Sequence, residues 1–149
     1  VRYPRGSGPG IEIENTNETL EIGKANLVKN THSEVTILSF GAMLELAIEV
    51  SNEIDCSVVD MRYVKPLDEK LISLLAEQDK LIVTLEENVL AGGAGSAVNE
   101  FLNQTKAYSK IINIGAPDKF PSVGSPSEQR NEAGLNKEKI IELINKKLS

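Results

Sequence analysis

Short apolar runs alternate with amphipathic segments along this chain of 149 residues, and that alternation restricts the folds it can adopt. The clearest runs, rich in β-branched residues, occupy residues 34–40, 56–61, 80–85 and 111–114. Apolar runs this short, bounded by turn residues, are typical of strands that are buried on both faces. A weaker strand pattern covers residues 21–29, and residues 11–13 suit a short extended piece.

Between these runs the apolar pattern changes to a helical period. From residue 43 to residue 54, apolar side chains recur every three or four positions, which indicates an amphipathic helix. Asp68 can cap a helix over residues 69–77, and Asn136 can cap a last helix with lysines on its polar side. A further helix is expected from about residue 96 to residue 103. Residues 117–134 are rich in turn formers, which predicts a loop-rich segment.

Strands that alternate with helices over short connections predict βαβ units. We therefore expect an α/β fold of three layers, in which a mostly parallel five-stranded sheet carries helices on both faces. Ligands of such sheets bind beyond the carboxyl ends of the strands. The segments expected at that edge are residues 40–42, 60–63, 85–88 and 114–116.

The composition excludes several classes of function. Lys and Arg total 16 against 22 Asp and Glu, a formal net charge of −6, which argues against a nucleic-acid or anionic-membrane binder. No apolar run approaches the roughly 18 residues of a membrane span. A single cysteine, Cys56, and a single histidine, His32, exclude a disulfide framework and most zinc sites. No secretory signal is visible, so we expect a cytoplasmic protein.

Two groups at the expected edge could carry chemistry, and each also has a structural interpretation. Loop 92–96, Gly-Gly-Ala-Gly-Ser, could hold an anion on its backbone N–H groups, but its glycines would equally permit tight strand-to-helix packing. Glu86 and Glu87 are adjacent, so in a strand they point to opposite sides and make a poor acid–base pair. One of them could hydrogen-bond to a neighbouring loop, and the pattern favours the structural interpretation of both groups.

The remaining reactive side chains indicate local roles. Asp60 and Arg62 suit an ion pair, and His32 lies in a polar stretch typical of a solvated loop. Cys56 begins an apparent buried strand and is expected in the core. No nucleophile, base and orienting group form a recognisable set, so we assign no catalytic residue and no metal ligand in this chain.

The first residues hold the one candidate ligand contact. Arg5 follows a proline, which fixes the backbone, and precedes a glycine, which permits close approach. An arginine held this way suits a phosphate or a carboxylate, because its planar fork donates two parallel hydrogen bonds. A surface arginine at a frayed terminus is the alternative. We interpret residues 1–10 as a linker from upstream domains and residues 11–149 as the folded domain.

The order of several motifs resembles one family. Tyr-Pro-Arg-Gly at 3–6, Asp-Met-Arg-Tyr-Val-Lys-Pro-Leu-Asp at 60–68 and Thr-Leu-Glu-Glu-Asn at 84–88 are its most informative pieces. With loop 92–96 and the later motifs at 114–118 and 130–135, they resemble the C-terminal domain of 1-deoxy-D-xylulose-5-phosphate synthases, in the transketolase superfamily. Pro121 departs from the family, which usually has an aliphatic residue there.

The resemblance implies part of a homodimeric enzyme that uses thiamine diphosphate and Mg²⁺. Such an enzyme joins pyruvate to glyceraldehyde 3-phosphate with loss of CO₂. In the family, domains that precede this one bind the diphosphate and Mg²⁺, so we expect this chain to bind neither and to be inactive alone. Its partners would be those N-terminal and central domains. The resemblance gives Arg5 a contact with the phosphate of glyceraldehyde 3-phosphate.

Two other interpretations stay open on the sequence. The chain could belong to a different superfamily member, a transketolase or the β subunit of a 2-oxoacid dehydrogenase. It could also be an independent α/β interaction module. The motif Arg-Tyr-Val-Lys-Pro-Leu-Asp at 62–68 favours the synthase over both.

Overall fold

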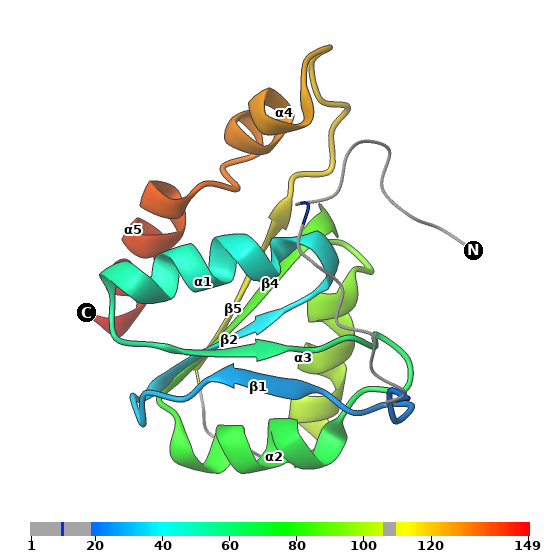
Figure 1. Ribbon diagram of the computed structural model, residues 1–149, viewed down its shortest axis with the longest axis vertical. Helices are drawn as coiled ribbons and strands as arrows, with labels where there is room; N and C mark the ends of the chain where they lie inside the picture. Colours follow the sequence, from blue (N-terminus) through cyan, green and yellow to red (C-terminus); the bar gives the residue numbers. More distant parts are fainter. Residues whose placement is uncertain (1–9, 11–18, 106–109) are drawn as a thin grey trace.

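A computed structural model of the protein describes residues 10, 19–105 and 110–149 (Figure 1). The extended piece expected at residues 11–13 lies outside them. The central layer is a five-stranded sheet in the order β1-β3-β2-β4-β5. Its strands are β1 (Asn26–Lys29), β2 (Val35–Ser39), β3 (Ser57–Asp60), β4 (Leu81–Val89) and β5 (Lys110–Ala116). All neighbouring pairs are parallel except β1 and β3, which are antiparallel, so the predicted sheet is confirmed.

Helices cover both faces of the sheet, as predicted. One face carries the short 3-10 helix η1 (Gly41–Met43), α1 (Leu44–Glu53) and α5 (Lys137–Leu148), and the other carries α2 (Glu69–Gln78) and α3 (Ala94–Thr105). A further helix, α4 (Pro126–Glu132), lies beyond the arrowheads of β4 and β5, at the top of Figure 1.

The central strand β2 is buried along its whole length, which explains its mostly apolar sequence. Its successive side chains point to opposite faces. Ile37 therefore packs in the core under α1 and α5, while Leu38 packs in the core under α2 and α3.

Two predicted caps are confirmed. The Asp68 carboxylate accepts a hydrogen bond from the backbone N–H of Leu71 at 3.2 Å, which begins α2. Its second oxygen accepts from the N–H of Ala25, also at 3.2 Å, and so fixes the chain just before β1. Asn136 caps α5 by accepting from the N–H of Lys139 at 3.0 Å.

The segment predicted to be loop-rich, residues 117–134, also contains a helix that the sequence pattern did not reveal, α4. The helix begins with a capping box, in which the Ser125 hydroxyl accepts from the N–H of Glu128 and the Glu128 carboxylate accepts from the N–H of Ser125. Pro126 occupies the first turn, where a missing N–H costs nothing. No residue of α4 is buried, so it has no apolar period to reveal it.

Strand β1 is shorter than the predicted segment 21–29 and is mostly exposed. Its pairing with β3 shifts register between Leu27 and Lys29, so the ladder is irregular. The Lys29 ammonium donates to the backbone carbonyl of Ser51, near the end of α1. Within the described ranges, no helix has the length and apolar character needed to cross a membrane.

Candidate functional site at the carboxyl edge of the sheet

The parallel register brings the predicted edge segments together. Ser39 pairs with Asp60 on β3 and with Leu85 on β4, so these three strands reach the edge at the same level. Backbone bonds continue past the strand ends, from the N–H of Phe40 to the carbonyl of Leu85 and from the N–H of Met61 to the carbonyl of Ser39, each at 2.9 Å. These bonds hold the segments that leave β2 and β3 in fixed positions relative to the neighbouring strands.

Glu86 is the buried carboxylate of this edge, with 2% of its surface exposed. One of its oxygens accepts from the N–H of Ala94 at 2.8 Å, and the other accepts from the N–H of Gly95 at 2.9 Å. These N–H groups open α3, where a helix has unpaired donors and a positive dipole end. Loop 92–96 thus does hold an anion, and that anion is the carboxylate of Glu86. The N–H groups of Ala94 and Gly95 are therefore not free to bind another anion.

Two glycines of the same loop are required by close packing. A Cβ atom on Gly93 would lie closer than 3.0 Å to the Glu86 carboxylate and to the carbonyl of Val89. A Cβ atom on Gly95 would meet Asn113 and Thr84 at similarly short range. The structural interpretation of the loop is therefore confirmed.

Glu87 points away from Glu86, as the strand geometry predicts. It is exposed, and its carboxylate lies 3.1 Å from Nε of Arg130 on α4. This ion pair joins the end of β4 to the helix that the sequence pattern did not reveal. At the other side of the edge, Asp60 and Arg62 form the predicted ion pair at 3.6 Å.

A cavity of about 300 Å³ lies between the ends of β4 and β5 and helix α4. Its walls combine apolar side chains with a few charged ones. The apolar members are Val89, Ala116, Pro117, Pro121, Pro126, Ala133 and Leu135, and the charged members are Glu87, Lys119, Arg130 and Glu132. The charges are already matched, because Lys119 lies 3.8 Å from Glu132 and Arg130 lies closer still to Glu87.

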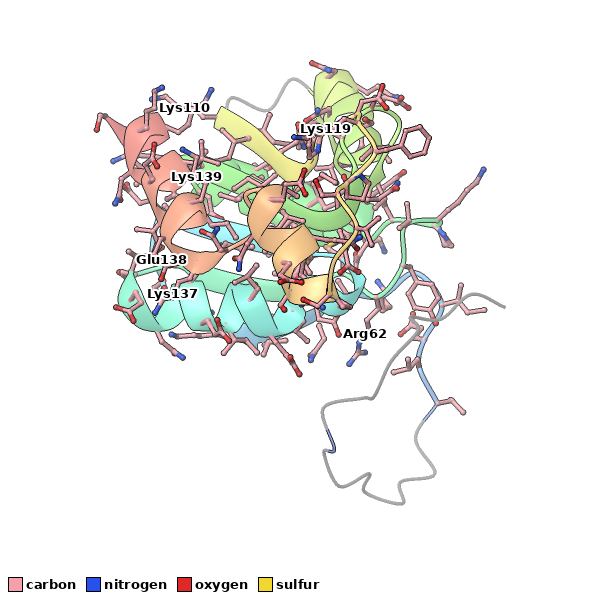
Figure 2. All side chains as sticks on the ribbon, turned by 90° about the horizontal axis from the view of Figure 1, so that it is seen from above. Arg62, Lys110, Lys119, Lys137, Glu138 and Lys139 are labelled. Atoms are coloured by element: carbon pink, nitrogen blue, oxygen red, sulfur yellow. The ribbon has the colours of Figure 1, made fainter. Side chains whose placement is uncertain are left out.

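Two cations of this edge, Lys119 and Arg130, line the cavity, and each is paired with a carboxylate. In Figure 2, Lys119 lies beside the segment that precedes α4, whereas Arg62 lies far from it across the same view. Lys110, Lys137 and Lys139 lie elsewhere, around α5. The labelled cations other than Lys119 thus lie away from the cavity.

The other sequence candidates that fall within the described residues occupy their predicted places. His32 is exposed in a loop, and Cys56 is completely buried just before β3. Burial raises the pKa of the Cys56 thiol to about 11, although the nearby Lys29 charge acts in the opposite direction. A thiol with so high a pKa is a poor nucleophile at neutral pH. Arg5 lies outside the described residues.

These observations bear on the cofactors that the resemblance implies. The described residues contain no group of three or more His, Cys, Asp or Glu side chains arranged to hold a metal ion. The N-terminus of α3, which the sequence offered as an anion site, is filled by Glu86. The described residues thus show neither such a ligand cluster nor a free N–H group of Ala94 or Gly95 for a diphosphate.

Comparison with known proteins gives the family. The family model "Transketolase, C-terminal domain" matches residues 23–140. The 1-deoxy-D-xylulose-5-phosphate synthase of Nitrosomonas europaea is 42% identical over 149 residues, which are all of this chain and 24% of that protein. The enzyme of the same name from Vibrio atlanticus is 48% identical over 97% of this chain, again 24% of its own length. This chain thus spans about a quarter of these curated relatives.

Solved structures agree with this result. A chain described as "Split gene transketolase, inactive beta4 tetramer" superposes with a TM-score of 0.79 at 28% identity, over 91% of this chain and 46% of that one. A transketolase from Campylobacter jejuni, at 19% identity and a TM-score of 0.55, shares the fold. The resemblance drawn from the motifs is confirmed. Because the family model covers most of the sequence and the fold superposes on a solved relative, this chain belongs to the transketolase C-terminal domain family.

Proposed function

We propose that this chain is the C-terminal domain of a thiamine-diphosphate-dependent 1-deoxy-D-xylulose-5-phosphate synthase. The observation that carries the proposal is identity of 42–48% to proteins of that name over nearly the whole chain. The motif at 62–68, which favours a synthase over other superfamily members, lies in the described fold directly after β3 and leads to the Asp68 cap.

In the proposed reaction, pyruvate loses CO₂ and its two-carbon remainder is joined to the aldehyde carbon of glyceraldehyde 3-phosphate. Thiamine diphosphate supplies the electron sink for that chemistry, and we place it with Mg²⁺ in the parts of the homodimer outside this chain. Glu86 supports this assignment of the cofactors to other domains, because its carboxylate is already bonded to two N–H groups of α3. This domain would support a site that other domains supply.

This assignment is tested by comparing this chain with the full-length synthase. We expect the full-length protein to form 1-deoxy-D-xylulose 5-phosphate, and this chain alone to form none and to bind no thiamine diphosphate by calorimetry. The split-gene transketolase chain, which is described as an inactive tetramer, supports this expectation. Micromolar binding of thiamine diphosphate to this chain would contradict it.

Arg5 is proposed to bind the phosphate of glyceraldehyde 3-phosphate. Replacing Arg5 with alanine in the full-length enzyme should remove a charge-assisted contact worth about 1.5–3 kcal/mol, a rise of roughly 10- to 150-fold in KM for that substrate. Steady-state kinetics with each substrate varied in turn would measure it. Pyruvate carries no phosphate, so its KM should change little.

Two matched variants sharpen this test. Arg5→Lys keeps the charge without the planar fork and should fall between the native enzyme and Arg5→Ala. Arg2→Ala removes a nearby arginine to which we assign no role, and should leave both KM values close to native. An unchanged KM for glyceraldehyde 3-phosphate together with a raised KM for pyruvate would refute the assignment.

A further inference from the structure

Residues 117–125 form a loop at the carboxyl end of β5 that presents large apolar side chains to solvent. Phe120 is 100% exposed and Val123 is 106% exposed, the highest values among the large apolar residues of the described chain. No other described part of the domain covers them. Exposed apolar side chains grouped in this way are typical of interaction sites.

The loop is held in place by hydrogen bonds, so this exposure is not that of a frayed segment. The Glu132 carboxylate accepts from the N–H of Ser122 at 3.0 Å, and the Gln129 side chain donates to the Ser122 carbonyl at 3.0 Å. The bond from Ser122 is the main reason that the pKa of Glu132 is lowered. Both partners lie on α4, and the Ser125 capping box fixes the end of the loop. Phe120 and Val123 are thus displayed on a fixed support.

The surface around the loop has the layout of a protein–protein interface. Pro121 and Pro117 continue the apolar surface from the loop into the cavity against β4, β5 and α4. The ion pairs Lys119–Glu132 and Glu87–Arg130 lie beside this apolar surface. An apolar centre with a charged rim is the arrangement that specific interfaces share.

The route of the chain indicates what covers this surface. Asn26, the first residue of β1, pairs with Asp60, the last residue of β3, so the polypeptide enters the domain at the carboxyl edge. The loop lies at the same edge on the far side of the sheet, four strand spacings or about 20 Å away. An average domain is wider than that. The curated relatives are about four times as long as this chain. The rest of such a polypeptide is large enough to reach from the start of β1 to the loop.

We propose that loop 117–125 is the docking element of this domain, with Phe120 and Val123 inserted into an apolar groove on the preceding part of the same polypeptide. This proposal rests on the proposed function, because it requires the longer chain that the synthase relatives have. The groove would be lined by aliphatic or aromatic side chains and edged by polar groups that meet Lys119 and Glu132. The loop would then fix how this domain sits against the rest of the enzyme.

Hydrogen exchange tests the proposal directly. In the full-length synthase, the amides of residues 119, 120 and 122–124 should exchange at least about tenfold more slowly than in this 149-residue chain, because docking excludes water from them. The double variant Phe120→Gln/Val123→Gln should abolish that difference. Leu74→Gln changes an exposed leucine on α2 and should leave it intact. Equal exchange in the full-length protein and in this chain would overturn the proposal.

A second measurement identifies the covering segment and separates this proposal from the proposed function. A photoreactive benzoylphenylalanine in place of Phe120 should crosslink within one polypeptide of the full-length protein. A crosslink to the second subunit, or none, would overturn the docking partner proposed here. Synthase activity is assayed on the same preparation: product without loop protection refutes only the docking, whereas protection without product refutes only the reaction. The unfolding midpoint of the double variant in this chain should be native, because both side chains are solvated there.

Discussion

Replacing Glu86 with alanine is expected to destabilise this domain by about 3 kcal/mol or more, because two hydrogen bonds to a buried carboxylate are lost together. The N–H groups of Ala94 and Gly95 would then be left without partners at a buried helix end. Their desolvation adds to the loss, and the deleted side chain leaves space behind it. Glu86→Gln keeps the shape but turns an amide NH₂ toward one N–H donor, so it should retain part of the stability.

Urea unfolding followed by circular dichroism would measure the effect on the isolated chain. Glu87→Ala is the matched control, since it removes the neighbouring carboxylate from an exposed ion pair with Arg130. Such a pair contributes at most about 1 kcal/mol. Equal losses for Glu86→Ala and Glu87→Ala would show that Glu86 does not hold α3.

Replacing Gly95 with alanine is the second large effect that we expect, at about 3 kcal/mol. The new methyl group would press against Asn113 and Thr84, which are themselves bonded to each other at 2.7 Å. Asn113 also accepts from the Asn99 amide at 2.7 Å, so it cannot turn aside without breaking a partly buried network. The alternative, a shift of α3 away from β4, would weaken the bonds to Glu86.

Gly92→Ala separates this steric effect from backbone strain. Gly92 has a φ of 73°, which is unfavourable for alanine, but a Cβ atom there would meet nothing within 4 Å. Its replacement should cost only about 1 kcal/mol. The denaturant midpoints of the two variants, measured under the same conditions, compare the steric cost at Gly95 with the backbone strain at Gly92. A cost for Gly95→Ala no larger than that for Gly92→Ala would contradict the close packing described here.

The parts of the fold that follow from local chemistry could be predicted from sequence. Asn136 and Asp68 begin their helices as their residue types indicate, and the period of two correctly sends Glu86 and Glu87 to opposite sides. Which of the two carboxylates is buried could not be predicted. That choice depends on where α3 sits above the sheet, and therefore on contacts between segments that come together only when the chain folds.

Helix α4 and the cavity beneath it were missed for one shared reason. A search for apolar periodicity cannot find a helix that buries none of its residues. The signal that could have found it was the sequence Ser125-Pro126-Ser127-Glu128, with its capping serine, first-turn proline and third-position glutamate. Without α4, neither the ion pair of Glu87 nor the position of Lys119 could be anticipated.

The irregular edge strand β1 has a consequence for how this domain behaves in concentrated solution. A sheet edge with unpaired backbone groups invites a strand from a neighbouring molecule, and long runs of such additions make fibrils. β1 is only four residues long, and its ladder is interrupted between Leu27 and Lys29. An incoming strand would have to reproduce that interruption and accept a lysine beside it. The short, irregular β1 therefore disfavours the addition of strands from other molecules at this edge of the sheet.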